Sequence, residues 1–163
     1  MKKIFYFACS ITLLLIISGC AGYKPIFGST NIKFKITNYS IEGNKILGNK
    51  IYAQLLDLSK LNENDPDTKG IDLYIQVIKN KIPTSKNTVG KIIEYQLTLN
   101  AEIIINDDLT ETKLLNQTFT SSSKYKAQDQ YSETLNLENQ IAENLINSIY
   151  QDLLITLSTN LTL

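Results

Sequence analysis

The feature that most constrains the fold is a long alternation of apolar and polar residues from Ile93 to Ile105. The odd positions of this stretch are isoleucine, tyrosine, leucine and alanine, whereas the even positions are mostly glutamate, glutamine, threonine and asparagine. A period of two residues is that of a β-strand with one face on a core and the other in a polar environment. We therefore expect a long strand in a sheet that is covered on one face.

The sequence around this strand divides into five further elements by its period. Residues 32–41 alternate with a change of phase near Asn38, which predicts a strand with a bulge. Residues 71–78 alternate as another strand, and residues 113–126 alternate weakly and are rich in hydroxyl groups, as in an edge strand. Apolar residues recur every three or four positions in residues 44–60 and from residue 129 onward, and this spacing predicts two helices.

The order strand, helix, three strands, helix is typical of an α+β fold. A length of 163 residues with 43% hydrophobic content suits one domain with its own core. We expect a single domain with a four-stranded sheet, in the order β-α-β-β-β-α, and with two helices packed on one face. The polar positions of the strands then form the opposite face, which is free to meet water or a polar partner.

The first twenty residues have the pattern of a bacterial lipoprotein leader. Two lysines precede an apolar run that is shorter than the ~20 residues of a membrane span, and the small residues before Cys20 follow it. These residues resemble a lipobox, in which the cysteine thiol is acylated and becomes the first mature residue. An ordinary secreted protein is the alternative, and it would leave Cys20 as an unpaired thiol. We expect a cleaved leader over residues 1–19, a lipidated lead segment over 20–30 and the folded domain over 31–163.

The composition argues against several classes of function. Sixteen lysines balance sixteen acidic residues, so no cationic excess is available for a nucleic-acid backbone. The chain has no histidine, which removes imidazole from catalytic triads and from metal sites. We therefore expect no nucleic-acid partner, no cofactor, no metal and no catalytic residue, and hence a protein that is not an enzyme.

Two polar groupings leave alternatives open. One offers oxygen ligands for calcium, but its spacing is not that of an EF-hand loop, and solvated turns explain it more simply. It consists of Asp65, Asp67, Asp72, Asp107 and Asp108. The other grouping, three serines at residues 121–123 beside Lys124, allows a serine–lysine catalytic pair, although a polar edge strand accounts for the same residues.

The remaining candidate site is a group of lysines around the turn between the second and third strands. Its members are Lys79, Lys81, Lys86, Lys91, Lys124 and Lys126. The last two end the fourth strand, which reaches the same end of an antiparallel sheet, so the ammonium groups are expected to converge and to bind phosphates of an anionic glycolipid. Alternatively, the lysines protect an exposed hairpin and sheet edge from aggregation.

The chain resembles the LPS-assembly lipoprotein family, LptE. The resemblance rests on the order of elements, on the Gly-Tyr-x-Pro-x-Phe segment that begins at Gly22, and on the Ala-x-x-Leu-Ile-x-x-Ile pattern that begins at Ala142. In lipoproteins of this kind an aspartate directly after the cysteine commonly marks retention at the inner membrane, so Ala21 favours the outer membrane.

The resemblance implies a non-catalytic outer-membrane lipoprotein that sits in the lumen of the barrel protein LptD. There it would plug the pore, assist barrel assembly and bind lipopolysaccharide. The lysines expected to contact lipopolysaccharide are chosen by their place at the expected tip of the sheet. They are Lys79, Lys81, Lys91, Lys124 and Lys126. The alternative is another envelope lipoprotein that serves a different barrel-assembly or envelope complex.

Overall fold

A computed structural model describes residues 33–61 and 68–160 of the chain, without the side chain of Asn160. These residues belong to one unit, Asn31–Leu163. The leader, Cys20 and the lead segment expected over residues 1–30 lie outside the described residues.

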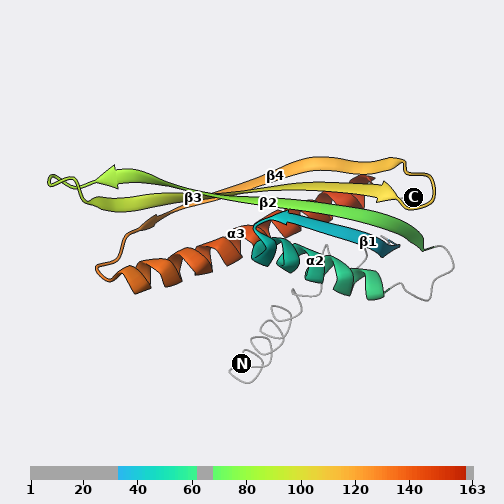
Figure 1. The fold of residues 1–163 in the computed structure, drawn as a ribbon, viewed down its shortest axis with the longest axis horizontal. Helices are drawn as coiled ribbons and strands as arrows, with labels where there is room; N and C mark the ends of the chain where they lie inside the picture. The colour runs from blue at the N-terminus through green and yellow to red at the C-terminus, as the bar shows by residue number, and fades with distance from the viewer. Residues whose placement is uncertain (1–32, 62–67, 161–163) are drawn as a thin grey trace, which may run out of the picture. The chain divides into compact units, whose positions relative to one another are not determined.

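The sheet has four strands in the spatial order β1-β2-β3-β4 (Figure 1). They span Phe34–Gly43, Lys69–Lys86, Ile92–Asp107 and Lys113–Lys126. Strand β1 runs parallel to β2, whereas β2, β3 and β4 are antiparallel neighbours. A parallel pair needs a crossover connection, which the helix between β1 and β2 supplies.

Two helices, α2 (Lys45–Lys60) and α3 (Tyr131–Asn160), cover one face of the sheet (Figure 1). Helix α2 begins after Asn44, whose side-chain oxygen accepts a hydrogen bond from the backbone N–H of Leu47 at 3.1 Å and so caps the helix. The expected α+β fold, with its β-α-β-β-β-α order and both helices on one face, is confirmed.

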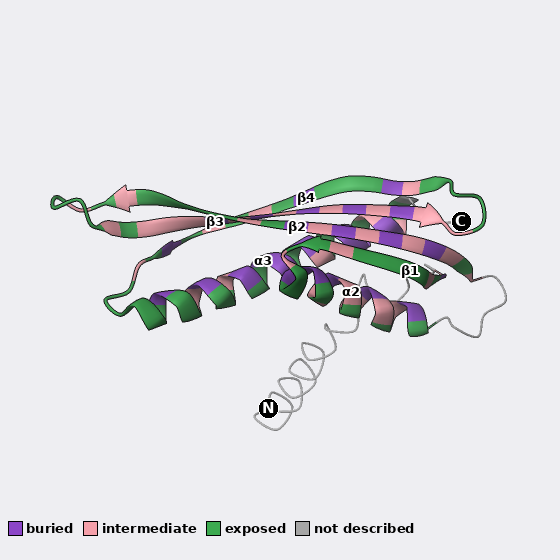
Figure 2. Cartoon of the chain, viewed as in Figure 1, coloured by how far each residue is buried: buried purple, intermediate pink, exposed green. Residues whose placement is uncertain are grey.

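The core lies between the sheet and the two helices, as the burial colours of Figure 2 show. The odd positions of β2 and β3 face the helices, as their alternation predicts, and each fully buried aliphatic side chain contributes about 1.5–3 kcal/mol. The fully buried members are Ile51, Leu55, Ile75, Val77, Leu97, Leu99, Ile103, Ile105, Ile146, Ile149, Leu153 and Leu157. The register of β1 on β2 shifts between Ile36 and Asn38, so the expected bulge is confirmed.

Strand β2 is longer than its hydrophobic pattern indicates. The apolar alternation ends near Ile78, but the strand continues to Lys86, and the turn to β3 is confined to residues 87–91. Beyond Val77 no described strand pairs with the β1 side of β2, and Pro83 is tolerated because a strand edge needs no backbone donor. The position of the turn expected around Lys79 and Lys81 is therefore wrong, since both lysines lie within the strand.

Gly48 marks a close approach of α2 to β1. A Cβ atom at this position would lie 2.5 Å from Cγ2 of Ile41. We expect Gly48→Ala to lower the free energy of unfolding by about 1 kcal/mol, because overpacking outweighs the gain in helix propensity. The same change should raise it by about 1 kcal/mol in an Ile41→Ala background, where the obstructing methyl group is absent. Urea unfolding of the four proteins tests this, and a stabilising effect in both backgrounds would contradict it.

Candidate functional site

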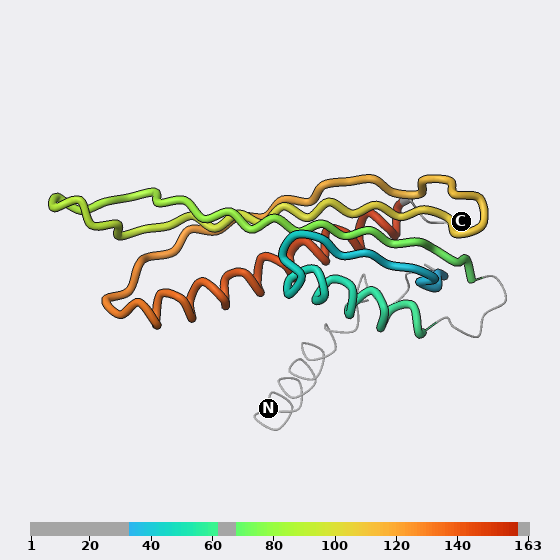
Figure 3. Tube along the Cα trace, viewed as in Figure 1, coloured from blue at the N-terminus to red at the C-terminus, as the bar shows by residue number. Residues whose placement is uncertain are grey.

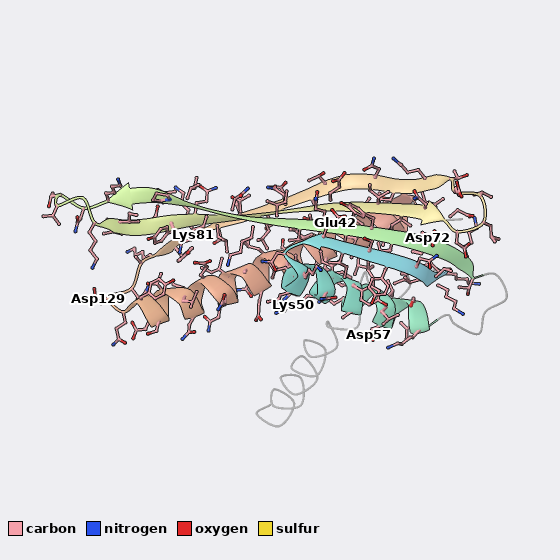
Figure 4. The ribbon with its side chains drawn as sticks, in the orientation of Figure 1. Glu42, Lys50, Asp57, Asp72, Lys81 and Asp129 are labelled. Carbon is pink, nitrogen blue, oxygen red and sulfur yellow. The ribbon has the colours of Figure 1, made fainter. Side chains whose placement is uncertain are left out.

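The structure divides the lysines of the sequence-predicted site between two faces. Lys79 and Lys81 continue the odd positions of β2 and lie on the helix-facing side, as Figure 4 shows for Lys81. Lys124 and Lys126 stand opposite Gln96 and Glu94 on the outer face. The expected convergence of all six ammonium groups is wrong, because alternation along a strand sends odd and even positions to opposite sides.

Lys91 belongs to neither group, because it lies in the turn between β2 and β3. The structure therefore gives the five predicted residues three different surroundings. Their contact with lipopolysaccharide stays a prediction.

Glu138 of α3 holds the two helix-facing lysines. Its carboxylate oxygens lie 2.6 Å from Nζ of Lys79 and 2.7 Å from Nζ of Lys81, and the hydroxyl of Tyr125 donates a hydrogen bond to it at 2.9 Å. The Glu138 side chain is 8% exposed, whereas the lysine side chains are 24% and 31% exposed. Lys81 also lies over the ring of Tyr95, 4.2 Å from its centroid, in a cation–π contact. We call Lys79, Lys81, Tyr125 and Glu138 the Glu138 cluster.

The contacts within the cluster shift the pKa values of Glu138, Tyr125 and Lys81. Burial alone would raise the pKa of Glu138, but hydrogen bonds from Lys79, Lys81 and Tyr125 lower it to about 2. Burial, reinforced by the bond to Glu138, raises the pKa of Tyr125 to about 12. Burial alone would lower the pKa of Lys81, but the hydrogen bond to Glu138 opposes this effect, and the pKa is raised overall. Lys81 and the carboxylate are therefore charged, and the tyrosine is neutral, at neutral pH.

The cluster ties the beginning of α3 to three strands, since its lysines come from β2 and its tyrosine from β4, with Tyr95 of β3 stacked on Tyr125. One carboxylate for two ammonium groups leaves a net charge of +1. Glu138 is not among the residues predicted for the site, yet the sequence carries a signal for it. It occupies the helical stripe that continues through Ala142 and Leu145. A carboxylate in an apolar stripe indicates a buried partner of opposite charge.

The outer face of the sheet is polar and carries few charges in its centre. Most even positions of β3 and β4 there are amides and hydroxyls, including an Asn100–Thr120 pair joined by a hydrogen bond of 2.8 Å across the strands, and Glu102 and Ile104 lie among them. Towards β1 the face carries the carboxylates of Glu42 and Asp72, each held by a hydrogen bond, from Tyr74 at 3.0 Å and from Asn38 at 2.8 Å. Figure 4 shows both carboxylates on these strands.

A shallow hollow of about 220 Å³ opens on this face where β1, β2 and β3 meet. It is lined by Asn38, Tyr39, Ser40, Asp72, Leu73, Tyr74 and Asn106. The amide, hydroxyl and carboxylate groups at its rim offer hydrogen bonds to a polar partner group.

The aspartates of the calcium alternative act within a turn. Oδ1 of Asp107 accepts hydrogen bonds from the backbone N–H groups of Leu109 and Thr110 at 3.0 and 2.9 Å, and these bonds lower its pKa. Asp108 accepts a hydrogen bond from Thr37 at 2.9 Å. In the described part of the chain no three acidic, cysteine or histidine side chains are grouped to hold a metal ion, and Asp65 and Asp67 lie outside that part.

The residues of the serine–lysine alternative are arranged as follows. Lys124 lies 4.0 Å from the carboxylate of Glu94, and within residues 33–61 and 68–160 no hydrogen bond joins its amine to a serine of the 121–123 group.

Neither α2 nor α3 is long and apolar enough to cross a membrane.

Comparison with solved structures identifies the fold as one found in bacterial lipoproteins. Rare lipoprotein B from Shewanella oneidensis matches 75% of this chain and 95% of its own, with a TM-score of 0.53 and 17% identity. A minor lipoprotein from Acinetobacter baumannii matches 79% of this chain and 92% of its own, with a TM-score of 0.55 and 16% identity. At such identities the likeness is one of fold.

A third structure extends this likeness. Lipoprotein B from Nitrosomonas europaea matches 84% of this chain and 90% of its own, with a TM-score of 0.54 and 15% identity. No known family profile and no curated protein sequence matches the chain.

Proposed function

We propose that this protein is a non-catalytic, lipid-anchored outer-membrane lipoprotein that forms a plug-and-barrel complex with LptD for lipopolysaccharide assembly at the cell surface. Two features support the proposal: the lipobox-like sequence before Cys20, and a fold similar to that of rare lipoprotein B. The observation that carries it furthest is the outer sheet face, which is extended and mostly polar, with one carboxylate, Glu102, among the amides and hydroxyls at its centre.

Such a face suits the interior of a barrel. The lumen of an outer-membrane barrel is polar, so a plug needs hydrogen-bonding side chains rather than a large apolar patch. Amides and hydroxyls donate and accept hydrogen bonds without the desolvation cost of burying an unpaired charge. Most even positions of β3 and β4 carry such side chains, so the outer face that they form meets this requirement.

The test is purification of the tagged full-length protein from outer membranes in mild detergent, with mass spectrometry of stoichiometric partners. Recovery of an LptD barrel is the expected result. Depletion of the protein should leave LptD misassembled and lipopolysaccharide held short of the surface, while other barrels assemble normally. Recovery of a different complex, or a general barrel defect, would sink the proposal and favour the alternative of another envelope lipoprotein.

A matched pair of variants tests the role of the outer face. Asn116→Glu with Ser122→Glu adds two charges to exposed positions of β4 on that face. Asn139→Glu with Asn144→Glu adds the same charges to exposed positions of α3. The β4 variant should recover roughly tenfold less barrel, because two carboxylates lose their water on docking. Equal recovery from both variants would remove the outer face from the interface.

The anchor makes a separate prediction at Cys20. The variant Cys20→Ala should accumulate as an uncleaved, unacylated precursor, because the thiol is the acceptor of the diacylglyceryl group. Intact mass and detergent partitioning measure this directly. A mass and membrane distribution equal to those of the wild type would show that the protein carries no lipid at this residue.

The lysines make a prediction that depends on their faces. Neutralising Lys91, Lys124 and Lys126 to glutamine should weaken lipopolysaccharide binding at low salt without lowering the unfolding midpoint, since all three are exposed. Neutralising Lys79 and Lys81 should instead lower that midpoint, because Glu138 would keep a buried charge without its partners. Binding measured at several salt concentrations, beside thermal unfolding, separates the two groups. Unchanged binding by the first variant would return those lysines to a solubility role.

A further inference from the structure

The hairpin of β2 and β3 runs past the rest of the sheet. Pairing of β1 with β2 ends at Val77, and pairing of β4 with β3 ends at Glu94, so residues 86–93 extend beyond both neighbouring strands. Figures 1 and 3 show this end of the hairpin lying beyond the start of α3. In the described part of the chain, neither helix covers the end of the hairpin.

Two β-branched apolar side chains are exposed at this end. Val89 in the turn is 84% exposed and Ile93 is 41% exposed. The turn is well ordered by its own bonds, because Oδ1 of Asn87 accepts hydrogen bonds from the backbone N–H groups of Val89 and Lys91 at 3.1 and 2.8 Å. The chain therefore presents Val89 to its surroundings from a fixed turn.

Lysines surround these apolar side chains. Lys86, Lys91 and Lys126 are exposed and form no ion pair with any described residue, and Lys124 lies 4.0 Å from Glu94. Over residues 82–94 and 124–126 there are four lysines and one acidic residue, so the net charge is 4 − 1 = +3. A second copy of this charged end is thus a poor partner, because like charges repel.

The opposite end of β3 provides a natural comparison. Its turn to β4 also exposes one large apolar side chain, Leu109, which is 88% exposed. There the acidic residues Asp107, Asp108 and Glu111 outnumber Lys113, so the net charge over residues 107–113 is 1 − 3 = −2. The sheet thus carries an apolar residue at each end, with cationic surroundings at one turn and anionic surroundings at the other.

We propose that the end of the β2–β3 hairpin docks on an anionic phospholipid surface. Val89, with Ile93, enters the headgroup region, while Lys86, Lys91 and Lys126 contact the lipid phosphates. Apolar side chains that enter the interface and cations that meet anionic headgroups act together in surface binding. The docking requires neither a barrel partner nor an acylated Cys20, so it stands or falls apart from the proposed function.

The absence of tryptophan from the chain gives a direct probe. Val89→Trp and Leu109→Trp each place one indole at an exposed apolar turn position, so the second controls for the affinity that the indole itself adds. The full-length proteins are reconstituted on vesicles of phosphatidylcholine with or without phosphatidylglycerol. Bromination of the acyl chains then reports contact with lipid.

On vesicles with phosphatidylglycerol, the tryptophan at position 89 should lose roughly half of its fluorescence to brominated lipid, and that at position 109 almost none. Adding Lys86→Gln, Lys91→Gln and Lys126→Gln should abolish this quenching, whereas Lys35→Gln, Lys45→Gln and Lys60→Gln should not. Equal quenching at both positions, quenching without anionic lipid, or reversal by inorganic phosphate at constant ionic strength would overturn the proposal. The proposal would also be overturned if the tryptophan at position 89 were shielded from solvent by an acidic protein and not by vesicles.

Discussion

Replacing Glu138 with glutamine should lower the free energy of unfolding by about 3 kcal/mol at neutral pH. The carboxylate is 8% exposed and its pKa falls from 4.5 to about 2 in the folded protein, a change that corresponds to roughly 3 kcal/mol. The variant also leaves Lys79 and Lys81 side by side without a counter-charge. Partial exposure of these lysines lets them turn towards water, which limits the loss.

The matched control is Glu143→Gln on the same helix. Glu143 pairs with Lys50, but its side chain is 57% exposed, so its removal should cost no more than about 0.5 kcal/mol. Urea unfolding of both variants at pH 7 compares a buried with an exposed ion pair on one element. Equal losses would show that Glu138 contributes no more than a surface contact.

The pH dependence gives a second readout for Glu138. Because its pKa is lower in the folded than in the unfolded state, the stabilisation is fully present above the unfolded value of 4.5 and is lost as the pH falls towards 2. The difference in stability between wild type and Glu138→Gln should therefore shrink from pH 6 to about pH 2. A difference that is independent of pH across this window would assign the loss to packing rather than to charge.

The strands and helices could be predicted because their signals are local. The alternation of β3 and the helical stripes of α2 and α3 each follow from one face meeting the core, and the bulge near Asn38 follows from a change of phase. The parallel pairing of β1 with β2 carries no such local signal. It is set by the crossover through α2, which is a tertiary feature.

The candidate site was less predictable because it depends on pairing across elements. Lys79 and Lys81 end the apolar pattern of β2 and so suggested a turn, yet a carboxylate 57 positions beyond Lys81 in the sequence lets the strand continue. Glu138 occupies a core position of α3, and only the fold shows which cations it meets. In the sequence, a long-range charge pair of this kind is indicated by a charged residue in an apolar stripe. The sequence does not identify the partner.

Gly43→Ala is expected to lower the free energy of unfolding by about 3–4 kcal/mol. Gly43 ends β1 with φ of 70°, a conformation that costs an alanine about 1 kcal/mol. In addition, a Cβ atom there would lie 2.2 Å from the carbonyl oxygen of Val77, which accepts the hydrogen bond of Asn44 at 2.7 Å. That oxygen belongs to the backbone of a buried strand and cannot move aside, so overpacking adds about 2–3 kcal/mol.

Gly90 separates the two contributions, because it has φ of 84° but no heavy atom within 4 Å of a Cβ atom. Gly90→Ala should therefore cost only about 1 kcal/mol, and Gly90→Asn less, because asparagine tolerates positive φ. At Gly43, asparagine should be no better than alanine, since both carry the obstructing Cβ. Rescue by asparagine at Gly43 in urea unfolding would show that conformational strain alone dictates glycine there. Failure of rescue would instead show that the close approach to the Val77 carbonyl, between β1 and β2, requires glycine at position 43.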